Sequence, residues 1–266
     1  MERFYSISRK ASAFILCAMV LILTGSRPSR LLKGKRIVTE RQECVLNNFT
    51  HVTEEVFPLT ISVDVPVAGS QRVIDSITVF LNESLYAFFD DGHECHIPYS
   101  FVYSEDIRQL ASHYRKAYMG SYLPKQTDMH EFNSDCLEVY LVAQTDTYVT
   151  YEVNHMFFGE GLEVLTEWTT FAKSDGHRLK EVIGSPDLLR FYQDHPDYRN
   201  SAVGEHVWRS LDSGTSFDFS GSVGLLADTV AYQHVFAPGI FEINTFPLDE
   251  IAPYLSQEAR DLSRKP

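Results

Sequence analysis

The densest group of potential metal ligands occupies residues 90–96, which read Asp-Asp-Gly-His-Glu-Cys-His. Every residue of this stretch except the glycine carries a group that can bind a metal ion. A structural zinc site, however, usually takes its ligands from two paired elements, and no second Cys or His doublet follows at such a spacing. We therefore interpret the stretch as a loop that ends a helix and carries a half-cystine, and we predict no metal site.

Motifs for catalysis are weaker still. Residues 212–222 are rich in Ser, Gly and Asp, but they lack the lysine of a phosphate-binding loop, so we interpret them as a surface loop. The Gly-x-Ser-x-Gly motif of one hydrolase class is absent, and the histidines are scattered. Acid pairs such as Glu160 and Glu163 could serve glycoside hydrolysis, but 36 acidic residues offer many such pairs. The sequence identifies no catalytic residue and predicts no cofactor, and an enzyme acting on a glycan stays open as an alternative.

The charge distribution indicates the kind of partner. The 266 residues carry a formal net charge of −13, but residues 1–36 hold eight of the 23 Lys/Arg and one of the 36 Asp/Glu. The remaining residues therefore hold 15 basic and 35 acidic side chains, a net charge of −20. Such a chain repels the phosphate backbone of nucleic acids and attracts cationic molecules. We expect no nucleic-acid partner and favour a cationic protein.

The amino terminus has the plan of a secretory signal peptide. Basic residues up to Lys10 precede a mostly apolar run from Ala11 to Thr24, and two small residues follow. The run is shorter than the roughly 20 residues that a bilayer span needs. We interpret residues 1–25 as a signal peptide or a retained signal anchor and residues 26–49 as a basic linker. The protein is then exported, and it meets a membrane only through an uncleaved amino-terminal segment.

Three cysteines remain if the signal peptide is removed: Cys44, Cys95 and Cys136. In an oxidising compartment two of them could pair, and a bridge between Cys95 and Cys136 would connect two parts of the amino-terminal half. Three buried, reduced thiols are the alternative. The sequence does not choose between these outcomes.

The hydrophobic pattern divides the amino-terminal half into helices and strands. Alternating apolar residues predict a strand at 56–65, and apolar residues at spacings of three and four predict a helix at 70–89. A second helix is expected from Ser104, with acidic residues in its first turn and basic residues in its last. The period then becomes two, which predicts a hairpin with strands at 137–141 and 149–153.

The carboxy-terminal half shows the same block-like order. The patterns predict three strands, at 162–171, 225–236 and 241–246, and helical segments at 185–192, 203–211 and 248–262. Blocks of helices and strands favour the α+β class over a doubly wound parallel sheet. We predict two lobes, 50–145 and 146–264, each with an antiparallel sheet and helices packed on one face.

Aromatic residues suggest a contact surface. The chain contains 14 Tyr, 18 Phe and two Trp, and exposed aromatic rings make rigid contacts with proteins or glycans. Tyr232, His234 and Phe236 alternate along one expected strand, so all three project from the same face. We take them as candidate binding residues. The alternative is that this face packs on a helix.

Three motifs of the carboxy-terminal half are similar to those of a known family: Tyr-Glu-Val-Asn-His at 151–155, Asp-Gly-His-Arg-Leu at 175–179 and Leu-Asp-Glu-Ile-Ala-Pro-Tyr at 248–254. With these motifs, residues 148–262 resemble the RsiV-like domain, the DUF3298 family. Residues 50–145 look like the smaller α+β domain that often precedes it.

The resemblance implies a function. Members of the family are exported or membrane-anchored bacterial proteins, and in some anti-sigma factors the domain is the extracellular sensor that captures lysozyme. Related modules accompany peptidoglycan deacetylase domains. This sequence departs from the pattern at 158–161, where the usual Gly-Gly-Ala-His-like turn lacks its histidine, and Glu160 in that turn joins the candidate binding residues.

The chain shows neither a sigma-binding domain ahead of the apolar run nor a deacetylase domain, so we expect neither activity. The resemblance implies a non-enzymatic binding module of the bacterial periplasm or cell envelope. Its ligand would be a cationic, lysozyme-like protein or peptidoglycan. A purely structural accessory domain is a further alternative.

Overall fold

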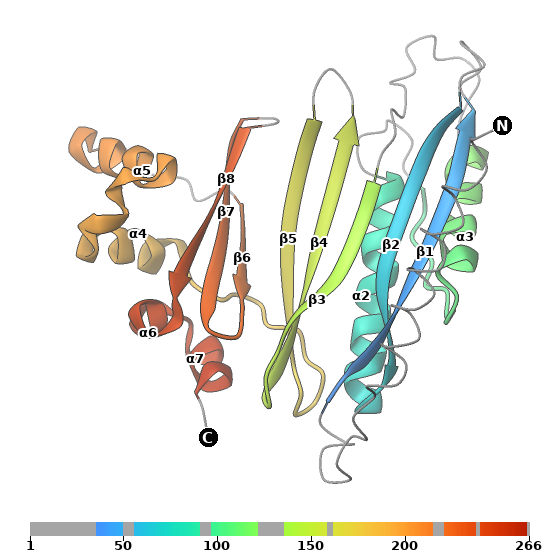
Figure 1. Cartoon of the computed structure of the whole chain (residues 1–266), viewed down its shortest axis with the longest axis horizontal. Helices are drawn as coiled ribbons and strands as arrows, with labels where there is room; N and C mark the ends of the chain where they lie inside the picture. Colours follow the sequence, from blue (N-terminus) through green and yellow to red (C-terminus); the bar gives the residue numbers. More distant parts are fainter. Residues whose placement is uncertain are drawn as a thin grey trace, which may run out of the picture. The chain divides into compact units, whose positions relative to one another are not determined.

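The computed structural model describes residues 36–49, 56–90, 97–121, 136–158, 162–214, 221–237 and 240–264. They form two β-sheets with helices packed against them (Figure 1), which is the α+β class predicted from the sequence. The expected signal peptide at 1–25 lies outside the described residues. Among the residues that the structure describes, no helix is long and apolar enough to cross a bilayer.

The larger sheet has five strands in the order β1-β2-β3-β4-β5. Neighbouring strands are antiparallel except for β2 and β3, which pair in parallel over Thr60–Val63. The strands are β1 (Val38–Phe49), β2 (Val56–Ala68), β3 (Cys136–Gln144), β4 (Tyr148–Phe158) and β5 (Leu162–Ala172).

The first strand occupies residues that were expected to form the basic linker. β1 forms an edge of the sheet and pairs with β2 along its whole length. Arg41 on β1 makes an ion pair of 3.0 Å with Asp64 on β2. Charged side chains are typical of edge strands, where they discourage pairing with other chains. The same charges remove the clean alternation of apolar residues by which a strand is recognised in a sequence.

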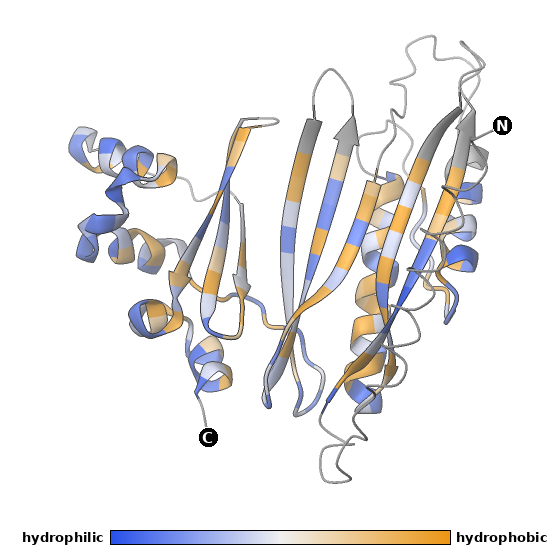
Figure 2. Cartoon of the chain, in the orientation of Figure 1, coloured by the Kyte–Doolittle hydropathy of each residue, from blue (hydrophilic) through white to orange (hydrophobic). Residues whose placement is uncertain are grey.

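Two helices make the crossover between the parallel strands, and they cover one face of the larger sheet (Figure 1). The helix α2 (Gln71–Asp90) matches the predicted range within one residue and buries most of the residues expected on its apolar face. Figure 2 shows apolar residues along α2 and the neighbouring strands. The helix α3 (Ile107–Ser121) begins later than Ser104. Asp106 precedes its first residue, and Asp106 Oδ1 accepts the Arg108 N–H at 2.9 Å, as an N-cap does.

The hairpin of β3 and β4 crosses the lobe boundary expected between residues 145 and 146. The two strands pair from Cys136 to Gln144, and β5 continues the same sheet. Buried apolar residues do form two clusters, but the first extends to Phe171 and the second draws mainly on residues from Leu179 onward. The expected boundary at 145–146 therefore lies within one sheet and one core.

The smaller sheet has three antiparallel strands in the order β6-β7-β8. One strand expected at 225–236 is in fact two, because a turn closed by a hydrogen bond from the Leu226 N–H to the Thr229 carbonyl separates them. The other carboxy-terminal elements occupy the expected regions. The elements are α4 (Ser185–Asp194), α5 (Ala202–Ser213), β6 (Gly221–Leu225), β7 (Thr229–Ala237), β8 (Ile240–Pro247), α6 (Leu248–Ile251) and α7 (Gln257–Ser263).

Candidate functional site

The outer edge of β5 is joined to the smaller sheet by side chains. Buried backbone groups at a sheet edge need hydrogen-bond partners. The Trp168 N–H donates to Ser222 Oγ at 2.9 Å, and the Thr166 N–H donates to Gln233 Oε1 at 2.8 Å. Ser222 lies on β6 and Gln233 on β7. The two sheets are therefore connected by hydrogen bonds from backbone to side chain rather than by a continuous strand ladder.

The chain itself covers the next part of this edge. After β5 it turns at Ser174–Gly176, as predicted, and Gly176 has a φ of 82°, which favours glycine. The Ala172 N–H then donates to the His177 carbonyl at 3.0 Å, and the Leu179 N–H donates to the Thr170 carbonyl at 2.8 Å. Beyond Leu179 the chain leaves the edge and continues towards α4.

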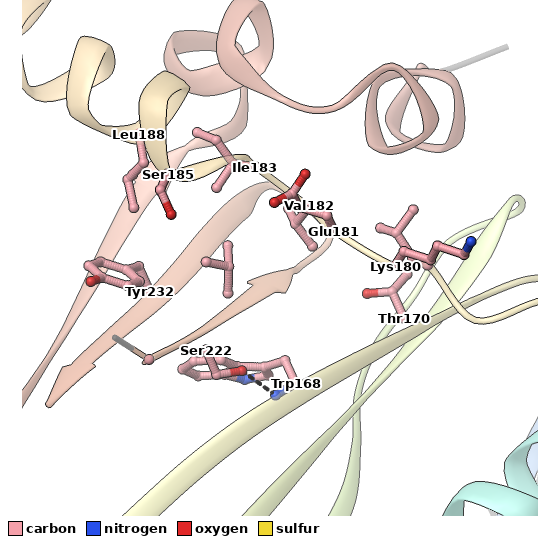
Figure 3. Close-up of a pocket in the computed structure, with 13 residues that line it drawn as sticks. Trp168, Thr170, Lys180, Glu181, Val182, Ile183, Ser185, Leu188, Ser222 and Tyr232 are labelled. Atoms are coloured by element: carbon pink, nitrogen blue, oxygen red, sulfur yellow. Dashed lines mark hydrogen bonds between the residues drawn. The ribbon is translucent and has the colours of Figure 1, made fainter. Parts of the chain in front are cut away.

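A pocket of about 330 Å³ lies where the chain leaves the edge (Figure 3). Its volume is near the lower end of the range for small-ligand sites, about 300–1,000 Å³. Figure 3 shows Ser185 on one side of the pocket and the hydrogen-bonded pair of Trp168 and Ser222 on the other. The polar and aromatic residues of the lining are Trp168, Thr170, Lys180, Glu181, Ser185, Ser222 and Tyr232.

The indole ring of Trp168 is held rigidly in this wall. Its Nε1–H donates to Glu152 Oε2 at 2.9 Å, and Glu152 Oε1 accepts a hydrogen bond of 2.9 Å from Asn154 Nδ2. The backbone of Gly224 lies directly against the ring, because a Cβ added there would be 2.4 Å from Trp168 Cγ. The pocket is thus preformed on this side.

The three candidate binding residues on β7 share one face, as predicted, but that face is turned inward. Tyr232 and His234 are 1% and 4% exposed, and the Tyr232 hydroxyl lies 2.8 Å from His234 Nδ1. The ring of His206 on α5 lies 6.0 Å from that of His234 and 5.8 Å from that of Phe236. The face packs on a helix, which leaves Tyr232 a place in the pocket wall only. Glu160 lies outside the described residues.

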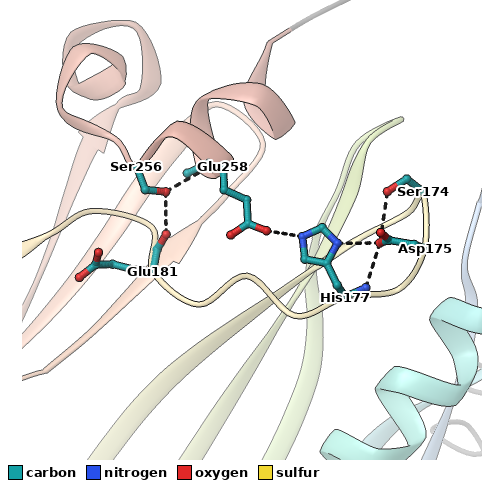
Figure 4. Close-up of polar contacts among 7 residues, drawn as sticks. Ser174, Asp175, His177, Glu181, Ser256 and Glu258 are labelled. Atoms are coloured by element: carbon teal, nitrogen blue, oxygen red, sulfur yellow. Dashed lines mark hydrogen bonds and ion pairs between the residues drawn. The ribbon is translucent and has the colours of Figure 1, made fainter.

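A polar cluster connects the turn after β5 to α7 (Figure 4). His177 Nδ1 lies 2.6 Å from Asp175 Oδ1, and His177 Nε2 contacts Glu258 Oε1 on α7. The hydrogen bond to Asp175 is the main cause that raises the pKa of His177. Burial opposes it, and the hydrogen bond to Glu258 adds a smaller rise. Hydrogen bonds from His177 lower the pKa of Asp175. All three side chains are exposed, so the cluster fastens two surface segments rather than forming a buried catalytic site.

The stretch at 90–96, where potential metal ligands are densest, is described at its first residue only. Asp90 ends α2, where its Oδ1 accepts the Ile97 N–H at 2.9 Å and its Oδ2 accepts the Tyr86 hydroxyl at 3.1 Å. Residues 91–96 lie outside the described part of the chain, and Cys95 with them. Cys44 is buried in β1, and burial raises the pKa of its thiol. The bridge considered between Cys95 and Cys136 therefore involves a residue outside the described part of the chain.

An exposed row of aromatic residues lies between α2 and α3 and was not predicted from the sequence. Tyr99, Phe101 and Tyr103 are 44%, 49% and 66% exposed, and Val79 on α2 is 38% exposed. The signal was present, because the three rings alternate with smaller residues at a spacing of two. The Val102 N–H donates to Asn82 Oδ1 at 3.2 Å, which fastens this segment alongside α2.

Carboxylates accompany the aromatic row. Glu105 accepts the Tyr103 hydroxyl at 3.2 Å, and this contact, with a smaller effect of Asp75, raises the pKa of Tyr103. Burial and then Glu83 raise the pKa of Tyr99. Glu83 is paired with Arg178, whereas Asp75 and Glu105 form no ion pair within the described ranges. We call the group of Asp75, Val79, Glu83, Tyr99, Phe101, Tyr103 and Glu105 the aromatic–acidic surface.

Comparison with known proteins supports the fold. No family model matches the chain, and no curated protein matches it significantly. A solved DUF3298 family member from Bacteroides fragilis is 13% identical with a TM-score of 0.55, over 86% of this chain and 98% of its own. A second, from Pseudomonas aeruginosa, is 11% identical with a TM-score of 0.52, over 84% of this chain and 96% of its own. The chain therefore has the fold of DUF3298 family proteins, and the resemblance stated from its sequence is confirmed at the level of the fold.

Proposed function

We propose that the protein is an exported, non-enzymatic binding module of the bacterial cell envelope that captures a cationic protein. The aromatic–acidic surface is the observation that carries this proposal. A lysozyme-like hydrolase is a partner of suitable charge. The signal-peptide pattern at 1–25 and the net charge of −20 beyond residue 36 support export and a cationic partner respectively.

The chemistry of the surface suits Lys and Arg side chains. A cation over the face of a Tyr or Phe ring gains about 0.5–1 kcal/mol at exposed sites. Glu105 accepts the Tyr103 hydroxyl at 3.2 Å, so that a cation could meet a ring and a carboxylate together. Exposed aromatic residues of this size also anchor protein interfaces when they become buried. The opposite charges of the two proteins would speed their encounter, and burial of the rings would stabilise the complex.

The test is binding of the purified protein to lysozyme at low and at moderate salt, measured by calorimetry. We expect saturable binding that survives moderate salt. Replacing Phe101 and Tyr103 together by Ala should weaken binding at least about tenfold, since two anchor rings are lost. Ile240→Ala removes an equally exposed apolar side chain from β8 and should have no effect.

A second pair of variants tests the charge. Asp75→Asn with Glu105→Gln should weaken binding and flatten its salt dependence, whereas Glu205→Gln, an exposed acid on α5, should change neither. Equal binding by the ring variants and the wild type would refute the proposal. Hydrolysis of labelled peptidoglycan by the pure protein would instead favour an enzyme acting on envelope glycan.

A further inference from the structure

At the edge of β5, two successive backbone groups that line the pocket of Figure 3 have no hydrogen-bond partner among the described residues. Four backbone groups of Trp168 and Thr170 point outward in succession. The first, the Trp168 N–H, is taken by Ser222, and the last, the Thr170 carbonyl, is taken by Leu179. The two between them are the Trp168 carbonyl and the Thr170 N–H. Among the described residues, neither of these has a hydrogen-bond partner.

The Trp168 carbonyl and the Thr170 N–H together fit one kind of hydrogen-bonding partner. In a parallel ladder, a carbonyl and an N–H two residues apart on one strand bond the N–H and the carbonyl of a single residue opposite. The N–H and C=O of one trans amide point in opposite directions and cannot reach both groups. The complement is therefore the main chain of one amino-acid residue, and a simple acetamide does not satisfy it.

The surroundings limit the ligand to a chain end. Ser222 and Leu179 close the edge on both sides of the two unpaired groups, so a long strand cannot add to β5 here. A ligand residue that runs parallel to β5 points its carboxyl end towards Thr170. Figure 3 shows Lys180 beside Thr170, and Lys180 is the cationic residue among those lining the pocket. A free α-carboxylate would meet the ammonium group there.

We propose that this pocket binds the carboxy-terminal residue of a short peptide. The residue's N–H donates to the Trp168 carbonyl, its carboxylate accepts the Thr170 N–H, and Lys180 neutralises the carboxylate charge. This site is separate from the aromatic–acidic surface and goes beyond the function proposed above. It gives the module a second ligand class, recognised through the main chain.

The experiment is a titration of the full-length protein with acetyl-Ala-Ala, followed by Trp fluorescence and by the amide resonance of Thr170. We expect saturable binding, a shift of the Thr170 resonance and slower hydrogen exchange at that amide. Two analogues isolate the contacts. Acetyl-Ala-lactate has an ester oxygen in place of the terminal N–H, and acetyl-Ala-Ala amide lacks the carboxylate. Each should bind about tenfold more weakly, because it loses one hydrogen bond or ion pair.

Matched variants show whether the peptide occupies this pocket. Ser185→Trp places bulk at the pocket's exposed rim and should abolish peptide binding, whereas Gln193→Trp puts the same bulk on the exposed face of α4 and should not. Lys180→Gln should remove the preference for the acid over the amide. Neither Ser185→Trp nor Lys180→Gln should change binding to lysozyme. Equal binding of the ester analogue, an unmoved Thr170 resonance, or no binding at millimolar peptide would each overturn the proposal.

Discussion

Ser222 Oγ accepts the Trp168 N–H at 2.9 Å, so that one side chain of the smaller sheet completes the edge of the larger one. The unpaired backbone groups of an open edge strand can pair with another chain. In this protein the edge is covered by single hydrogen bonds from several elements, which leaves room between them. The pocket is a consequence of this way of joining two sheets.

Replacing Ser222 by Ala should lower the free energy of unfolding by about 1–3 kcal/mol, because the Trp168 N–H then has no partner in a largely buried position. Urea denaturation followed by fluorescence measures the change. Ser174→Ala, in the exposed turn after β5, is the control and should change it by less than about 0.5 kcal/mol. A Ser222→Ala protein as stable as the wild type would show that water replaces the hydroxyl.

The backbone of Gly224 packs directly against the ring of the same tryptophan. A methyl group at this position would lie 2.4 Å from Trp168 Cγ, so Gly224→Ala must displace the ring or the strand. We expect a loss of about 1–3 kcal/mol and a shift in the Trp emission maximum. Gly184→Ala is the matched control, because the nearest atoms to its added methyl lie 3.7 Å away. Similar effects of both substitutions would argue against close packing of β6 on the indole.

Substitutions of Tyr232 distinguish a binding role of this side chain from a structural one. The side chain is buried in the second core, so Tyr232→Ala should cost about 3–5 kcal/mol of stability and would abolish any binding by unfolding the site. Tyr232→Phe keeps the ring and removes the hydroxyl that lies 2.8 Å from His234 Nδ1, at a cost of about 0.5–1.5 kcal/mol. Thermal unfolding of both variants measures the two losses of stability. A stable Tyr232→Ala protein would contradict the burial.

The local pattern of apolar residues was sufficient to predict much of the fold but little of the candidate site. The spacing in α2 and the alternation in β3 and β4 are properties of contiguous residues, and both predictions are confirmed. β1 was missed because its partner, and not its own pattern, makes it a strand. The alternation of Tyr232 with His234 places them on one face, but what covers that face depends on α5, which no spacing within β7 can reveal.

The relation of Trp168 to Ser222 is a contact between two distant segments that were predicted as strand and loop. No local period connects them. The aromatic row at Tyr99, Phe101 and Tyr103 shows the opposite case. Its alternation can be read from the sequence, but a row of this kind is buried in most strands, and only the packing of its segment beside α2 shows that it is exposed.

The cluster around His177 should make stability depend on pH in a defined window. Its pKa is raised above the unfolded value of about 6.5, chiefly by Asp175. The stabilisation is therefore complete below about pH 6.5 and is lost as pH rises through the folded-state pKa. The pKa of Asp175 is lowered, so its contribution is present above about pH 4 and is lost as pH falls. Between these limits both contributions to stability are present.

We expect His177→Gln to lower the urea midpoint at pH 5 and to have a smaller effect at pH 8. The side chains are exposed, so the difference should be modest and should shrink in high salt. His113→Gln is the control, because His113 Nε2 contacts the neutral hydroxyl of Ser100. A deficit of equal size at both pH values would mean that His177 contributes through packing, whereas a deficit that grows towards pH 8 would reverse the assigned sign and refute the charged cluster.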